Sequence, residues 1–137
     1  MAKIKIFFLC LILFISACRE TPPEKPDKQK IIKKGAELFA KFGCAVCHSL
    51  DGKELYGPPL NNIYMKNTKV LRQRQEFTIV ADRDYLLKAI SEPRYEKVLE
   101  YSNKEMPIPS FSGKEAEVLV DYIIEINEKN RAKNGIQ

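Results

Sequence analysis

The stretch Cys44-Ala45-Val46-Cys47-His48 decides how the rest of this 137-residue chain is interpreted. Two cysteines separated by two residues, with a histidine directly after the second, form the pattern through which a haem is attached covalently to protein. The two thiols can add to the vinyl groups of the porphyrin, and the histidine can bind the iron from one face. The motif therefore predicts one covalently bound haem c.

Two other uses of paired cysteines fit this sequence less well. A redox-active pair would need a thioredoxin-like βαβ context, which the pattern of the chain does not provide. A structural zinc site would need two further ligands, and the remaining cysteines, Cys10 and Cys18, lie in or beside an apolar N-terminal segment.

The N-terminal segment has the pattern of a secretory signal peptide over residues 1–17. Lys3 and Lys5 precede the apolar run Ile6–Ile15, and small residues follow it. That run is shorter than the ~20 apolar residues that a membrane-spanning helix needs. The sequence therefore predicts an exported protein.

Ile15-Ser16-Ala17-Cys18 resembles the lipobox of bacterial lipoproteins, in which cleavage before the cysteine leaves it as the lipidated N-terminus. Several acyl chains on Cys18 would be enough for stable anchoring on the periplasmic side of a bacterial membrane. The alternative is cleavage after Ala17 by ordinary signal peptidase, which would release a soluble protein.

Residues 18–30 are rich in proline and charge, and we expect a flexible linker there, with a reach of roughly 35–40 Å. A single domain follows over residues 31–130, and residues 131–137 are expected to be a disordered tail.

Three helices are expected in this domain, which places it in the all-α class. The first is predicted over 31–42 and ends at Gly43, the second begins at Asp82 and ends before Pro93, and the third begins with a capping box formed by Ser112 and Glu115. Each has an apolar face at helical spacing.

The segments between these helices are expected to be mostly irregular. Residues 61–75 are polar and basic, and Phe77–Val80 has strand-forming residues that support at most a short hairpin arm. Residues 94–105 have a mixed sequence pattern and are expected to be irregular, with one turn of helix considered at 95–99. Two prolines keep residues 106–109 extended.

His48 is the only histidine, so a second imidazole from the same molecule cannot bind the iron. The sixth ligand must be a methionine, a lysine, a small molecule or nothing. Met106, on its proline-stiffened strip, can be laid across the haem face opposite His48, whereas Met65 is 17 residues from His48 and must share its side of the loop.

The chain resembles a class I cytochrome c from Lys30 to about Asn130, and it is similar to the cytochrome c domains fused to subunit II of some terminal oxidases. The matching pieces are Gly35–Phe39, Cys44–His48, Gly57-Pro58-Pro59-Leu60, Met106-Pro107 and the final apolar helix. The resemblance implies three to four helices around one haem. Residues 61–75 do not match the family pattern.

The resemblance also implies roles for particular residues. Cys44 and Cys47 would form the thioethers, and His48 and Met106 would be the axial ligands. The carbonyl of Pro58 would accept a hydrogen bond from His48, and Leu60 would touch the ring. Phe39 and Tyr122 would lie where the first and last helices cross.

A haem with both axial positions filled leaves no place for a substrate, so we expect an electron carrier of a respiratory chain rather than an enzyme. The alternatives are a fixed haem subunit of an oxidase or reductase complex, and a ligand sensor or weak peroxidase from which Met106 dissociates. The net charge of +5 gives no reason to expect nucleic acid as a partner. Six basic residues could instead steer acidic redox proteins to the haem edge: Lys41, Lys53, Lys66, Lys69, Arg72 and Arg74.

Overall fold

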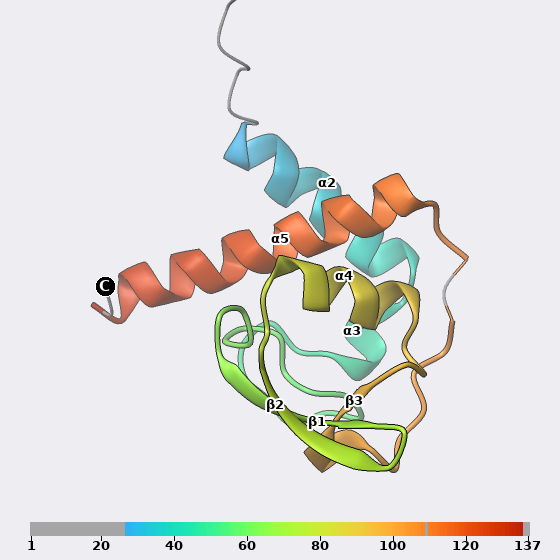
Figure 1. Cartoon of the computed structure of the whole chain (residues 1–137). Helices are drawn as coiled ribbons and strands as arrows, with labels where there is room; N and C mark the ends of the chain where they lie inside the picture. The colour runs from blue at the N-terminus through green and yellow to red at the C-terminus, as the bar shows by residue number, and fades with distance from the viewer. Residues whose placement is uncertain (1–26, 109, 136–137) are drawn as a thin grey trace, which may run out of the picture.

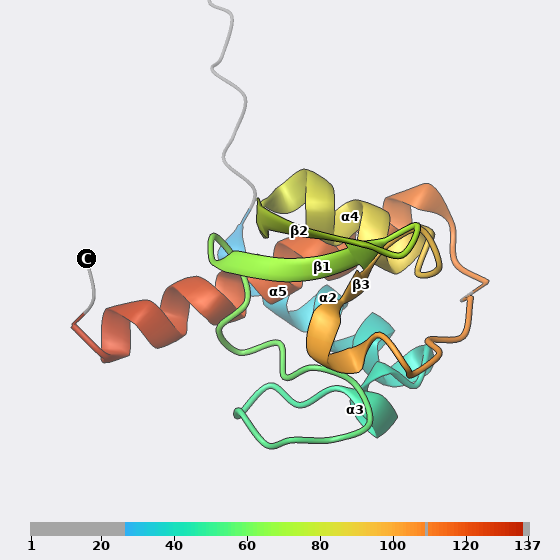
Figure 2. The ribbon, with the colours of Figure 1, turned by 60° about the horizontal axis from the view of Figure 1, so that its bottom comes forward.

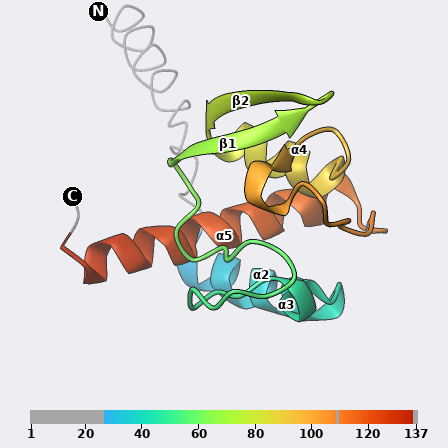
Figure 3. The same cartoon turned by 90° about the horizontal axis from the view of Figure 1, so that it is seen from below.

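A computed structural model describes residues 27–108 and 110–135, and the predicted signal peptide, Cys18 and most of the linker lie outside this range. The described part contains four helices, α2 (Lys28–Lys41), α3 (Cys44–Cys47), α4 (Arg83–Ser91) and α5 (Gly113–Lys133). It also has a short 3-10 helix, η1 (Leu99–Tyr101), and three strands, β1 (Asn67–Arg72), β2 (Gln75–Val80) and β3 (Lys97–Val98). Figure 1 shows α2 crossing α5, and in Figure 3 α5 runs between α2 and α3 on one side and α4 with the sheet on the other.

Helix α2 begins at Lys28, so the linker expected to continue to residue 30 is already helical there. The side chain of Asp27 accepts a hydrogen bond from the amide of Gln29 and caps the helix start. The helix ends at Lys41, and Gly43 adopts the left-handed conformation (φ 69°) that stops it, as expected.

Helices α2 and α5 cross in close contact. A side chain at Gly35 would place its Cβ 2.2 Å from Tyr122 Cβ, so only glycine permits this approach. The rings of Phe39 and Tyr122 pack edge to face with centroids 6.0 Å apart. The predicted crossing is therefore confirmed at both aromatic residues.

Helix α5 begins with the predicted capping box and is longer than expected. The Ser112 hydroxyl accepts from the Glu115 amide, and the Glu115 carboxylate accepts from the Ser112 amide. Residues 131–133, expected to belong to a disordered tail, are helical. The Arg131 guanidinium donates to the Tyr64 carbonyl at 2.6 Å, which ties this end of the helix to the loop below it.

Helix α4 starts and ends where the sequence predicts. Asp82 accepts a hydrogen bond from the Tyr85 amide at 2.8 Å, and the helix finishes before Pro93. Its buried Leu86 packs against Val120 and Ile123 of α5. Helix α4 and α5 thereby form a second, smaller cluster of buried side chains beside the α2–α5 crossing.

The basic segment 61–75 contains a complete strand rather than irregular chain. Strands β1 and β2 form an antiparallel hairpin, and the short β3 pairs with the other edge of β1 to give the order β2-β1-β3 (Figure 2). The strand expected at Phe77–Val80 begins two residues earlier. The turn of helix considered at 95–99 is wrong in position, because β3 occupies 97–98 and η1 follows it.

Candidate functional site

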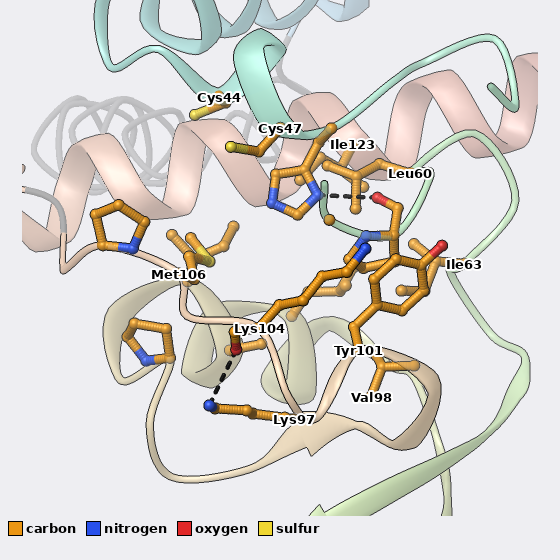
Figure 4. Close-up of a pocket in the computed structure, with 18 of the residues that line it drawn as sticks. Cys44, Cys47, Leu60, Ile63, Lys97, Val98, Tyr101, Lys104, Met106 and Ile123 are labelled. Carbon is orange, nitrogen blue, oxygen red and sulfur yellow. Dashed lines mark hydrogen bonds between the residues drawn. The ribbon is translucent and has the colours of Figure 1, made fainter. Parts of the chain in front are cut away.

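Cys44, Cys47 and His48 line one cavity because α3 turns the motif toward the interior. Gly43 separates α2 from this short helix, and the amide of His48 donates to the Cys44 carbonyl at 2.9 Å. Both cysteines are free and half-buried. Burial raises the pKa of the Cys44 thiol. Figure 4 shows the two thiols at one edge of the cavity.

The imidazole of His48 is held with one nitrogen toward the cavity. Its Nδ1 lies 2.8 Å from the Pro58 carbonyl oxygen, which can only accept, so Nδ1 carries the proton and Nε2 keeps its lone pair. Burial lowers the pKa of His48, which favours the neutral form that binds metals. The ring packs on Gly57, where a Cβ would lie 2.4 Å from His48 Cε1. The contact expected between His48 and Pro58 is present.

Backbone hydrogen bonds fix the loop that carries Pro58. The amide of Gly57 donates to the Cys47 carbonyl, and the amide of Leu60 donates to the Ser49 carbonyl, both at 2.8 Å. The buried Ser49 hydroxyl donates to the Lys53 carbonyl at 2.7 Å. These bonds, made on either side of Pro58, hold the loop against His48.

Asn127 of α5 anchors the same loop, and it is a site residue that no sequence motif indicates. Its Oδ1 accepts from the amides of Ile63 and Tyr64 at 2.7 and 3.0 Å, and its Nδ2 donates to the carbonyls of Leu60 and Ile123, both at 2.7 Å. The side chain is 1% exposed. The available signal was an asparagine four residues after Ile123, on the apolar face of a helix.

Met106 lies in the wall of the cavity that holds His48, whereas Met65 does not. Met106 comes from the extended strip before α5, and its side chain is turned into the cavity in Figure 4. Met65 does not line the cavity and is 54% exposed. Of the two methionines, only Met106 is brought together with the motif.

The remaining walls are mostly apolar and come from every layer of the fold. Leu60 and Ile63 come from the loop. Other apolar lining residues come from α2 (Phe39), α4 (Leu86, Ala89 and Ile90), β3 (Val98) and α5 (Leu119 and Ile123). Leu60 lies in the wall, as expected for a residue that touches a haem ring.

A few charged groups lie at the cavity, and most of them are paired. Lys97 donates to the Lys104 carbonyl at 3.0 Å and pairs with Glu105. Glu96 pairs with Arg72 of β1. The ammonium of Lys104 lies over the rings of Tyr56 and Tyr101.

The basic residues expected around the haem edge are dispersed. None of the six lines the cavity. Lys41 pairs with Glu115, Lys53 pairs with Asp51, and Arg72 is turned inward to Glu96. Lys66, Lys69 and Arg74 are exposed on or beside the hairpin.

This arrangement fits haem c better than a bare metal ion. No group of three or more histidine, cysteine or acidic residues that could hold a metal occurs among residues 27–108 and 110–135. The cavity offers two thiols, a neutral imidazole with a free nitrogen, and a thioether, in an apolar lining. Iron already bound within a porphyrin needs only the two axial ligands.

Comparison with known proteins agrees with this assignment of the site. The cytochrome c family profile matches residues 32–127, which is most of the chain. The fold is similar to that of a cytochrome c from Rhodothermus marinus, with a TM-score of 0.51 and 17% identity over 81% of this chain and 88% of that one. No match was found among curated proteins. The family match over these residues shows that the chain belongs to the cytochrome c family.

Proposed function

We propose that this cytochrome c is an exported, lipid-anchored electron carrier of a respiratory chain, with His48 and Met106 as the two axial ligands of its haem c. Membership of the family implies the covalent haem and supports a carrier role. The observation that carries the proposed ligand pair is that Cys44, Cys47, His48 and Met106 line one cavity, while Met65 is exposed elsewhere.

Each residue of the site has a distinct role in this proposal. The haem, when bound, supplies reversible one-electron chemistry at its iron. Cys44 and Cys47 would hold the ring by thioether bonds, and the Pro58 carbonyl keeps His48 in the tautomer that could bind iron. The Met106 thioether would be the second iron ligand, and a thioether ligand raises the reduction potential of a haem. With both positions filled, the site transfers electrons and performs no chemistry on a substrate.

The anchor is proposed from the sequence, since Cys18 lies outside the described residues. No helix of residues 27–108 and 110–135 is long and apolar enough to cross a membrane. We infer that acylated Cys18 holds the domain at the periplasmic side of a bacterial membrane, with the segment before Asp27 as a tether. Changing Cys18 to alanine should move the protein from the membrane fraction to the soluble periplasmic fraction. Retention in the membrane would refute the lipid anchor.

The proposed partners are redox proteins with acidic docking surfaces, such as an oxidase, a reductase or a dehydrogenase. Lys66, Lys69 and Arg74 remain available to such partners, because they are exposed and no ion pair involves them among the described residues. Steered association of this kind weakens as ionic strength rises. Constant association with one complex at high salt would instead support a fixed haem subunit.

The ligand pair can be tested by changing the two methionines separately. Met106→Ala should open the iron, giving a high-spin reduced spectrum, carbon monoxide binding and a lower reduction potential. Met65→Ala is the matched control and should leave all three unchanged. An unchanged spectrum in Met106→Ala would exclude Met106 as the ligand. Carbon monoxide binding by the unaltered reduced protein would favour a ligand sensor over a carrier.

A further inference from the structure

A partly buried ion pair joins the β-hairpin to the wall of the haem cavity. Nη2 and Nε of Arg72 lie 2.7 and 3.1 Å from the same carboxylate oxygen of Glu96. The Glu96 side chain is 5% exposed and that of Arg72 is 32% exposed. A carboxylate removed from water to this extent is costly unless a cation compensates it.

Contacts with two aromatic rings, in addition to the ion pair with Glu96, fix the position of Arg72. Its guanidinium lies over the ring of Phe77 from β2 and over that of Tyr95, with the carbon 5.1 Å from each centroid. Planar guanidinium groups stack well on aromatic faces. The hairpin therefore holds this positive charge beside the buried carboxylate.

Glu96 also lies in the wall of the cavity that contains Cys44, Cys47 and His48. The other acidic group in that wall, Glu105, pairs with Lys97. If Glu96 had no partner, its negative charge would act on the iron through a low-dielectric interior, where charge interactions are strong. A negative charge stabilises the oxidised, more positive form of the iron.

We propose that the hairpin sets the reduction potential of the haem, with Arg72 as a positioning residue that neutralises Glu96 beside the cavity. This inference depends on the proposed haem site. It gives a function to residues 67–80, which do not contribute to haem attachment or ligation. It also predicts that removing Arg72 and removing Glu96 shift the reduction potential in opposite directions. A pair that only stabilised the hairpin would not produce this result.

The test measures the reduction potentials of haem-loaded variants. Arg72→Gln should lower the potential, Glu96→Gln should raise it, and the double variant should return close to the unaltered value. A single uncompensated charge is expected to change the redox equilibrium roughly tenfold, or about 59 mV for one electron. Lys69→Gln is the matched control, because it removes the same charge from the exposed face of the same strand.

Arg72→Lys separates charge from packing. Lysine keeps the charge but loses the stacked, two-point contact, so the melting temperature should fall. The reduction potential should shift no more than it does in Lys69→Gln. The proposal is overturned if Arg72→Lys shifts the potential as much as Arg72→Gln, or if the Arg72→Gln and Glu96→Gln shifts have the same sign. It is also overturned if neither shift exceeds that of Lys69→Gln.

The visible spectrum distinguishes failure of this proposal from failure of the proposed function. Protein without haem, or haem without the His/Met spectrum, would contradict the proposed function itself. A normal His/Met spectrum with unaltered potentials in all Arg72 and Glu96 variants would contradict only the role of the pair.

Discussion

The loop that follows Pro58 depends on Asn127, a side chain far from the haem-attachment motif in sequence. All the hydrogen-bonding capacity of its amide is used, and three of its four partners belong to the loop 60–64 that follows Pro58. Pro58, whose carbonyl oxygen contacts His48, lies two residues before this loop. The side chain therefore connects α5 to the segment that orients His48.

Asn127→Ala should destabilise the protein by about 3 kcal/mol, because each buried donor left unpaired costs roughly 1–3 kcal/mol. The measurement is urea unfolding followed by circular dichroism. Asn130→Ala is the control, since Asn130 makes one side-chain bond, to the Asn61 carbonyl at 3.0 Å, and should cost less. Equal losses in the two variants would mean that the loop does not depend on Asn127.

At the residue level, the sequence predicted the residues of the haem-attachment motif but not Asn127, which supports the loop next to them. Cys44, Cys47 and His48 are adjacent in the chain, so their spacing alone indicates their chemistry. Asn127 contacts the loop across more than sixty positions, and nothing in its local sequence identifies that partner.

The β-hairpin depends on a turn that its sequence does not favour. Gln73 and Arg74 connect β1 to β2, and both have left-handed backbones, with φ of 49° and 66°. Two-residue hairpin turns of this kind usually contain Asn-Gly or Asp-Gly. The missing signal explains why the basic segment 61–75 could not be recognised as the first arm of a hairpin.

Replacing Gln73-Arg74 with Asn-Gly should raise the free energy of unfolding by about 1 kcal/mol, because non-glycine residues in this conformation are strained by roughly that amount. Thermal unfolding of the single and double variants would show it. Lys69→Asn, within β1 rather than in the turn, is the control and should not stabilise the protein. A destabilised double variant would contradict the turn assignment.

The start of α5 should contribute an acid-sensitive part of the stability. Hydrogen bonds from the Ser112 amide, Lys41 and the Ser112 hydroxyl lower the pKa of Glu115 to about 2. The folded-state pKa is below the unfolded value, so this stabilisation is present above about pH 4.5 and is lost as the pH falls toward 2.

Glu115→Gln should therefore reduce the pH dependence of unfolding between about pH 4.5 and 2, as measured by chemical denaturation across that range. Glu117→Gln, on the exposed face of the same helix, is the control. If both variants reduce the pH dependence of the free energy of unfolding equally, the effect comes from overall charge rather than from the capping box.

For the molecule as a whole, the cavity is lined by residues from two small groups of buried side chains. One surrounds the α2–α5 crossing and includes Leu38 and Phe39, and the other surrounds Leu86 between α4 and α5. The half-buried Leu60 and Ile90 pack against both groups. A haem in this cavity would complete a core that the protein side chains only partly form.

Preventing haem attachment should therefore weaken both stability and cooperativity. The variant Cys44→Ala/Cys47→Ala should melt at a lower temperature, over a broader range, than the haem-loaded protein in circular dichroism. The unaltered chain produced without haem is the control for the substitutions. An equally sharp transition without haem would show that the protein core is sufficient by itself.

Helical pattern and capping residues predicted α2, α4 and α5, because those signals are local. The small sheet, the extension of α5 to Lys133 and the pairing of Arg72 with Glu96 depend on contacts between distant segments, which a single sequence does not reveal.

The direction of α2 has a consequence for how an anchored molecule could meet its partners. The described chain enters at Asp27, next to the first turn of α2, and the haem motif follows the last turn. Fourteen helical residues span about 21 Å. In the proposed anchored protein, the helix would thus be a rigid spacer between the tether and the haem-attachment motif. A flexible tether ending at Asp27 would add its own reach to this fixed length, so that an anchored domain could meet partners at different heights above the bilayer.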